Sequence, residues 1–266
     1  MTHYFISDLH LSDKRPDLIR AFTSLSDLIC LKQHQEGNIK LSVVGDFYEA
    51  WIGDDFTSSW NDDIEAALIK LSHAGVKLRV FHGNRDFLLG QLWANRVQAE
   101  LIEGSFCLSH NAQTILISHG DEACLDDVEY QAFRSMVRQG AWQKQVLSMP
   151  LENRIALASK LREDSKSSNS EKMLDIMDVH GDEIKRLMTL HNAKVMIHGH
   201  THRPDLHKLS NGSRLVLGDW DKFAWLSILD ETGLSQYKFD VNELSEEKND
   251  LDSLLAVSKR MHVLKI

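Results

Sequence analysis

The chain has 266 residues, of which 42% are hydrophobic, and this length and apolar content support one large domain with a buried core. Its net charge of −9 argues against a general nucleic-acid-binding protein, which would present a basic surface. Cys30, Cys107 and Cys124 lack the spacing of a metal site, no signal peptide is visible, and no apolar run approaches the ~18 residues of a membrane span, so we expect a soluble cytoplasmic protein with reduced thiols.

The first predicted strand, residues 4–6, is followed at once by Asp8 and His10. Residues two apart on an extended segment point to the same side, so a carboxylate and an imidazole would be presented together. That pair suits a divalent transition metal, although Asp8 as a plain turn residue beside a polar His10 explains the pair alone equally well. A helix from Pro16 to about Leu31 follows.

Three further buried strands are predicted at residues 41–44, 77–81 and 114–118. Each ends in polar residues, at the carboxyl end where open α/β sheets place their ligands. The polar residues that follow these strands include Asp46, Asn84 and His119.

Between about Asp127 and Asp178 helical spacing replaces the strand pattern. Residues 134–172 hold eight basic and four acidic side chains, a net +4 in an acidic chain. On the residues alone, we favour a helical excursion that packs on the core and exposes a solvated basic face. A lid over a binding site is the alternative.

The last predicted core strand, residues 193–197, runs into His198-Gly199-His200-Thr201-His202. Gly199 permits a tight turn, and Pro204 prevents the strand from continuing in a sheet. Neutral imidazole is the commonest metal ligand in proteins, although a His-rich surface loop explains this run taken alone.

Five strand endings with this choice of residues indicate one site. The candidate ligands are too many for one tetrahedral zinc and include no thiolate, which suits two mixed N/O sites sharing a carboxylate. His198 is then expected beside the site without binding metal, and Asp86 and Asp121 are candidates to orient ligand imidazoles. The candidate ligands are Asp8, His10, Asp46, Asn84, His119, His200 and His202.

In order and spacing these motifs resemble those of the calcineurin-like metallophosphoesterases. The resemblance implies an α/β fold, a four-layer α-β-β-α sandwich of two mixed sheets with a helical cap insertion. The core would be residues 1–126 and 179–240, the cap 127–178, and 241–266 a C-terminal extension. One metal would be held by Asp8, His10, Asp46 and His202, and the other by Asp46, Asn84, His119 and His200, with Asp46 bridging.

Residues 45–55, 82–90, 119–121, 130–134 and 176–179 also resemble the UDP-2,3-diacylglucosamine pyrophosphatases of lipid A biosynthesis. This resemblance implies a hydrolase whose substrate is a lipid-linked nucleotide sugar. With such a substrate, the segment 127–178 is interpreted as a lid, and the face shared by Phe133, Met136 and Val137 is expected to contact the acyl chains. Hydroxide attack on the uridine-side phosphorus would give UMP and 2,3-diacylglucosamine 1-phosphate. It also implies two divalent ions, with Mn²⁺ as the usual metal, and peripheral attachment to the cytoplasmic face of the inner membrane.

By the same resemblance, Asn84 and Arg85 would serve catalysis, and the substrate would be bound by Asn84, Arg85, Asp127, Ser165, Asn169, Lys172 and His200. The run Gly218-Asp219-Trp220-Asp221 departs from the more usual Gly-Ala-Trp, which leaves this loop less well defined.

Two other classes of function compete with this interpretation. A cyclic nucleotide phosphodiesterase or a phosphoprotein phosphatase would use the same metals but would not need a basic, apolar cap. A non-catalytic scaffold with a protein-binding surface would be marked by lost ligands, whereas all seven are present.

Overall fold

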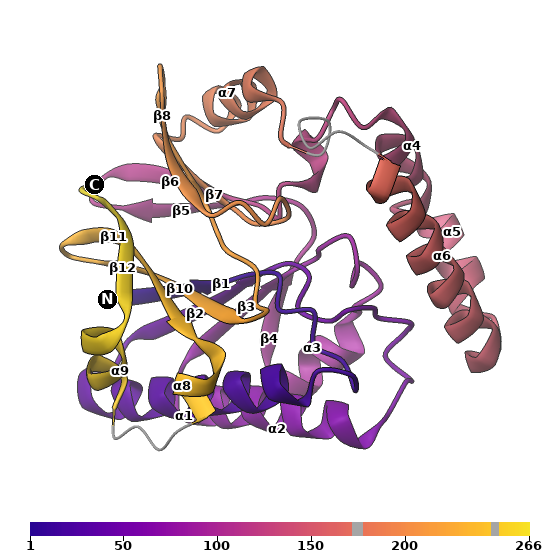
Figure 1. Ribbon diagram of the computed structural model, residues 1–266, viewed down its shortest axis with the longest axis horizontal. Coiled ribbons are helices and arrows are strands. Elements are labelled where there is room, and N and C mark those ends of the chain that lie inside the picture. Colours follow the sequence, from indigo (N-terminus) through magenta and orange to yellow (C-terminus); the bar gives the residue numbers. More distant parts are fainter. Residues whose placement is uncertain (172–177, 246–249) are drawn as a thin grey trace.

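The structure is a computed structural model that describes residues 1–171, 178–245 and 250–266, and its centre is a pair of β-sheets (Figure 1). Both sheets are mixed, because each combines parallel and antiparallel pairs of strands. The larger has the order β12 (Lys259–Leu264), β11 (Gly233–Asp240), β10 (Phe223–Asp230), β1 (Thr2–Ile6), β2 (Ile39–Val44), β3 (Lys77–Phe81), β4 (Ala99–Ile102). The smaller has the order β5 (Phe106–His110), β6 (Gln113–Ile117), β7 (Val195–His198), β9 (Gly212–Val216), β8 (Asp205–Leu209).

The alternation of side chains along β1 explains the layers. Phe5 points between the two sheets and packs there with Ile117 and Ile197 of the smaller sheet. Its neighbours Tyr4 and Ile6 belong to the core on the opposite face, as alternate residues of a strand must. Helices α1 (Pro16–Glu36), α2 (Ser59–His73) and α3 (Gln91–Val97) cover that face, and α7 (Gly181–Leu190) covers the outer face of the smaller sheet. The predicted four-layer sandwich is confirmed.

Residues 128–171 form three helices beside the sandwich, which we call the cap: α4 (Val128–Val137), α5 (Gly140–Leu147) and α6 (Leu151–Glu171). Its arginines bind the core instead of pointing into solvent. The buried Arg154 guanidinium donates to the Ile52 carbonyl at 2.7 Å and pairs with Asp55, and Arg138 donates to the Gly83 carbonyl at 2.9 Å. Part of the positive charge of the cap therefore holds the cap against the core.

The segment 241–266 was predicted as an extension, and its described residues contribute to the core. Leu244 of α8 (Val241–Ser245) and Leu251 and Leu254 of α9 (Leu251–Val257) pack in the same apolar cluster as α1. Lys259 and Arg260 begin strand β12, which pairs with β11. Within the described part of the chain, no helix has the length and apolar character that crossing a membrane requires.

Candidate metal centre and substrate cavity

The predicted ligands follow the carboxyl ends of β1, β2, β3, β6 and β7 and come together, but not through extended geometry. Asp8, His10, Asp46, His200 and His202 all have positive φ, between 49° and 67°. Non-glycine residues seldom adopt this left-handed conformation, which costs about 1–3 kcal/mol for each residue. The sequence argument that alternate residues share one side of a strand is thus wrong here, because β1 ends at Ile6 and β7 at His198. Tight turns aim the side chains inward.

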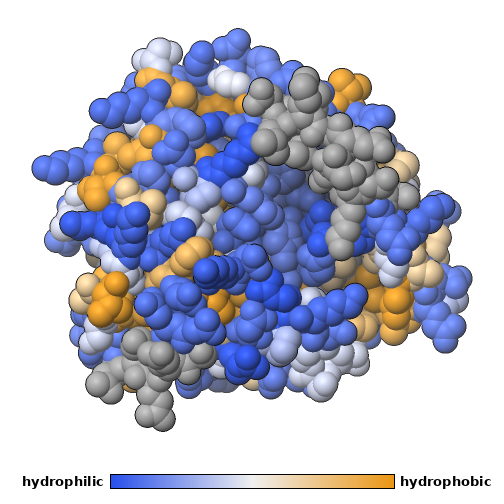
Figure 2. Space-filling model, in the orientation of Figure 1, coloured by the Kyte–Doolittle hydropathy of each residue, from blue (hydrophilic) through white to orange (hydrophobic). Residues whose placement is uncertain are grey.

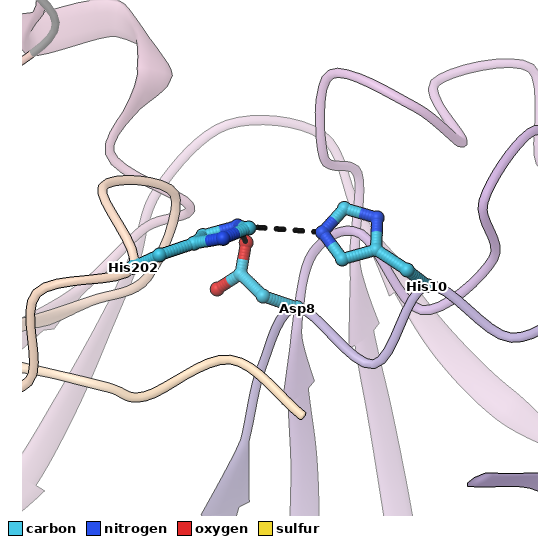
Figure 3. Close-up of side chains that lie close together, drawn as sticks. All are labelled: Asp8, His10 and His202. Carbon is cyan, nitrogen blue, oxygen red and sulfur yellow. Dashed lines mark hydrogen bonds and ion pairs between the residues drawn. The ribbon is translucent and has the colours of Figure 1, made fainter. Parts of the chain in front are cut away.

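One group of donors consists of Asp8, His10 and His202 (Figure 3). Nε2 of His202 lies 3.3 Å from Oδ1 of Asp8 and 3.3 Å from Nε2 of His10. Two imidazole nitrogens at this distance share at most one proton, so at least one presents a lone pair. Asp8 itself is fully buried and accepts the backbone N–H of His200 at 3.0 Å.

The second group surrounds the side chain of Asn84, whose Oδ1 lies 3.0 Å from Nε2 of His119 and 2.8 Å from Nδ1 of His200. The ring of His119 is oriented by the Val44 carbonyl, 2.9 Å from its Nδ1. Asp46 faces both groups. Its Oδ1 lies 3.7 Å from Nε2 of His119 and its Oδ2 3.8 Å from Nε2 of His10, as a bridging ligand requires.

A cavity of about 610 Å³ extends from these donors to the cap. Its polar end includes Asn84, Arg85, His200 and His202, and its other walls are largely apolar. Figure 2 shows hydrophilic residues around the hollow in the middle of this face and hydrophobic residues toward the cap. The apolar lining is Ala50, Trp51, Ile52, Phe87, Leu88, Phe133, Trp142, Val146, Leu157, Ala158 and Leu161.

Comparison with known proteins agrees with this architecture. Residues 1–204 match the family of calcineurin-like phosphoesterases. A UDP-2,3-diacylglucosamine hydrolase of Cellvibrio japonicus is 41% identical over 245 residues, covering 91% of this chain and 100% of the relative. One from Marinobacter nauticus is 42% identical, covering 85% of this chain and 92% of the relative. The chain belongs to the UDP-2,3-diacylglucosamine hydrolase family. The family predicted from the motifs is thereby confirmed.

Among solved structures, an archaeal phosphodiesterase aligns with 90% of this chain and 100% of its own, with a TM-score of 0.46 and 13% identity. This similarity is remote. The assignment of the chain to its family rests on the sequence relatives.

The electrostatics of the site fit the divalent cations that a metallophosphoesterase needs. Burial lowers the pKa of His119, but the carboxylates of Asp46, Asp8 and Asp121 outweigh burial and raise it to about 9. Burial would raise the pKa of Asp8, yet its hydrogen bond with His202 and the neighbouring imidazoles hold it well below its usual range. Buried carboxylates are costly unless cations compensate them. The donors are all nitrogen or oxygen. Two triads, one of Asp8, His10 and His202 and one of Asp8, Asp46 and His119, each hold one donor atom per residue within 4.8 Å of the others. These residues therefore fit two divalent ions.

Two acidic residues that the sequence argument missed touch ligand imidazoles. Oε2 of Glu49 lies 3.2 Å from Nδ1 of His10, and Oδ2 of Asp219 lies 3.5 Å from Nδ1 of His202. Glu49 falls inside a family motif, but nothing in its spacing marks it as a partner of His10. Asp219 lies in the loop between β9 and β10, outside the segment that carries His202, so only the fold shows that the two side chains meet.

The two acids predicted to orient imidazoles have other partners. Asp86 accepts the backbone N–H groups of Gly83 and Phe47, both at 2.8 Å, and so fixes two ligand-bearing loops. Asp121 accepts from the Tyr130 hydroxyl at 2.6 Å and from Arg134 at 2.7 Å, both on the cap. His198 is buried, with its Nδ1 2.9 Å from the Gly199 carbonyl, and belongs to neither donor triad.

The predicted substrate residues are only partly described. Arg85 and Asp127 line the cavity, and Asp127 also caps α4 by accepting the N–H of Tyr130 at 3.1 Å. Ser165 and Asn169 lie on α6, where the side chains are outside the described part, and Lys172 lies outside the described residues.

The three residues of α4 that were expected to contact acyl chains lie in three different environments. Phe133 lines the cavity, Val137 is buried in the core cluster, and Met136 is 44% exposed and does not line the cavity. The expected contact of Val137 and Met136 with acyl chains is therefore wrong. Leu157 and Leu161 of α6 take their place in the cavity wall.

Proposed function

We propose that the protein hydrolyses the diphosphate of UDP-2,3-diacylglucosamine to UMP and 2,3-diacylglucosamine 1-phosphate, with attack at the uridine-side phosphorus. The observation that carries this proposal is the cavity, which joins the N/O donors to apolar walls shared by core and cap. A small phosphomonoester or a cyclic nucleotide has no acyl chain that would fill the space between such walls. Acyl chains would gain about 25 cal/mol for each Å² of apolar surface buried there.

Different residues along the cavity would bind the metal ions and the phosphate groups. Divalent ions held by the seven donors would polarise phosphoryl oxygens and activate the attacking water. Arg85 lines the cavity beside Asn84, and its guanidinium can pair with phosphate oxygens, which stabilises the charge that develops during the reaction. The backbone N–H of Arg85 donates to Oδ1 of Asp46 at 2.8 Å, so the same residue fixes the bridging carboxylate.

The test is release of UMP from UDP-2,3-diacylglucosamine by the purified protein in ¹⁸O-labelled water. We expect the label in UMP. Label in the lipid phosphate would place the attack on the other phosphorus. Turnover of a cyclic nucleotide or a phosphopeptide, without turnover of the diacylated substrate, would overturn the proposed substrate and favour the competing phosphoesterases.

For the metal we propose Mn²⁺, because an imidazole and oxygen donor set without thiolate suits a harder divalent ion. Chelation should silence the enzyme, and Mn²⁺ should restore activity better than Mg²⁺. Full activity of the stripped protein in the presence of chelator would contradict both the metal centre and its assigned residues.

We further propose that the protein attaches peripherally to the cytoplasmic face of the inner membrane through its cap. Val128 on α4 and Ile155 on α6 expose large apolar side chains on the part of the protein that borders the cavity. Val128→Glu should reduce co-sedimentation with vesicles containing anionic phospholipid. Leu190→Glu, at a site on α7 that is 66% exposed against 73% for Val128, is the matched control and should sediment as the wild type does. Equal binding by both variants would refute attachment through the cap.

A further inference from the structure

A carboxylate outside the seven donors faces the outer nitrogen of His202. Nε2 of this imidazole is directed at the metal centre, 3.3 Å from both Oδ1 of Asp8 and Nε2 of His10. The opposite nitrogen, Nδ1, lies 3.5 Å from Oδ2 of Asp219, within ion-pair distance. The side chain of His202 is 40% exposed, so its surroundings restrain the ring less than they restrain the buried Asp8 and His119.

The loop that carries Asp219 joins β9 to β10 and is fixed on both sides of this residue. The N–H of Leu217 donates to the His198 carbonyl at 2.7 Å, and the N–H of Trp220 donates to the Asp8 carbonyl at 3.0 Å. Trp220 is buried, and its indole N–H donates to the Trp225 carbonyl at 3.1 Å. The backbone of Asp219 is thus tied to the two segments that carry the first and the last ligands of the same donor group.

A neighbouring residue adds to this rigidity. Gly218 lies so close to the ring of Trp225 that a Cβ at this position would approach it to 2.3 Å. The loop therefore packs flat against β10 immediately before Asp219. A carboxylate held in this way needs little reordering to meet His202, so its interaction costs little conformational entropy.

We propose that Asp219 is a positioning residue for His202: it accepts a hydrogen bond from Nδ1–H, which fixes the ring and leaves the Nε2 lone pair directed at the metal. Carboxylate partners of this kind set the tautomer of a ligand imidazole and increase its basicity. The inference rests on the metal centre proposed above. It predicts that Asp219 contributes to metal affinity without touching the ion or the substrate.

The test is Mn²⁺ titration of the metal-stripped protein, by calorimetry or by competition with a chromogenic chelator. Asp219→Ala should weaken one of the two bound ions by about 10- to 100-fold and leave the other nearly unchanged. Asp219→Asn keeps an oxygen that can accept a hydrogen bond from Nδ1–H, so it should retain most of the affinity that Asp219→Ala loses. Wild-type affinity for both ions in Asp219→Ala would overturn the proposal.

The same loop offers a matched control in Asp221, whose Oδ1 pairs with Arg15 at 2.7 Å and which has no place in the donor groups. Asp221→Ala removes the same charge and should bind both ions as the wild type does. An equal loss of Mn²⁺ affinity in Asp219→Ala and Asp221→Ala would show that only the net charge of the loop matters. That result would overturn the positioning role.

A double-mutant cycle identifies the partner. If Asp219 acts through His202, Asp219→Ala should weaken binding no further once His202→Ala is in place. Additive losses would overturn the assignment to His202. Failure of the wild-type protein to bind Mn²⁺ at all would instead refute the proposed metal centre, so the two failures are distinguishable.

Discussion

Glu49 connects the cap to the metal centre, because one of its carboxylate oxygens contacts the guanidinium of Arg162 on α6. Its other oxygen lies 3.2 Å from Nδ1 of the ligand His10. Burial raises the pKa of Glu49, but its hydrogen bond with His10 and the charges of His10, Arg162 and Arg85 outweigh burial and lower it. The carboxylate therefore stays ionised, with one oxygen on the cap and one on the centre.

This arrangement predicts that substitutions of Arg162 and Glu49 have different effects on catalysis and on metal affinity. Arg162→Ala should lower kcat/KM for the diacylated substrate about tenfold, or about 1.4 kcal/mol, because it removes a half-buried link between cap and core. It should leave Mn²⁺ affinity at the wild-type value. Glu49→Gln should lower both quantities, because it also loses the negative charge beside His10. Parallel kinetics and Mn²⁺ titrations of the two variants check this, and an equal loss of metal affinity in both would contradict it.

The bridging carboxylate gives a second prediction. Each oxygen of Asp46 faces a different donor group, so Asp46→Ala should weaken both ions and reduce kcat by at least about 1,000-fold. Metal content by mass spectrometry and UMP release are the measurements. Asn95→Ala, on the outward side of α3, is a control that should keep two ions and full activity. Two tightly bound ions in Asp46→Ala would show that this carboxylate does not bridge.

Much of the metal centre could be predicted because it depends on local sequence. A buried strand followed by Asp, Asn or His identifies both the end of the strand and the donor, and the fold brings those ends together. The geometry could not be predicted, because the left-handed turns at Asp8 and His200 have no distinctive residue pattern. The contacts of Glu49 and Asp219 with the ligand imidazoles could not be predicted for a different reason. Their partners are defined by packing between segments, which neither periodicity nor spacing encodes.

The cap shows the same limit. Helical spacing indicated its helices correctly, and the apolar face of α4 is real. Yet neighbouring residues of that face meet the cavity, the core and the solvent in turn, because the helix lies at the junction of all three. Which of Phe133, Met136 and Val137 faces the cavity is decided by where α4 rests on the core.

A third prediction concerns stability and pH away from the metal centre. His3 is buried, its Nε2 is 2.8 Å from the Ser42 hydroxyl, and burial, with smaller effects of Arg79 and Lys40, lowers its pKa to about 3. Below pH 6.5 the unfolded chain gains a proton at His3 that the folded protein does not, so its contribution to stability is lost as the pH falls from 6.5 toward 3. From pH 7 to pH 5 this loss should reach about 2 kcal/mol.

The measurement is the free energy of urea unfolding of the metal-stripped protein at pH 7 and pH 5. His3→Gln keeps a polar group near Ser42 but does not titrate, so it should lose about 2 kcal/mol less stability than the wild type over this interval. An identical pH dependence in the two proteins would show that His3 is not held neutral in the folded state.

The last prediction tests the cavity wall. Phe133 lines the cavity, so Phe133→Ser should lower kcat/KM for the diacylated substrate by about 10- to 150-fold, the equivalent of about 1.5–3 kcal/mol for one large buried side chain. Hydrolysis of a small artificial phosphodiester should fall much less, because the metal ligands lie on the core. Met136→Ser is the matched control on the same helix, since Met136 is exposed and does not line the cavity, and it should retain turnover of both substrates. Equal losses on both substrates in Phe133→Ser would mean that this side chain supports the fold and does not bind acyl chains.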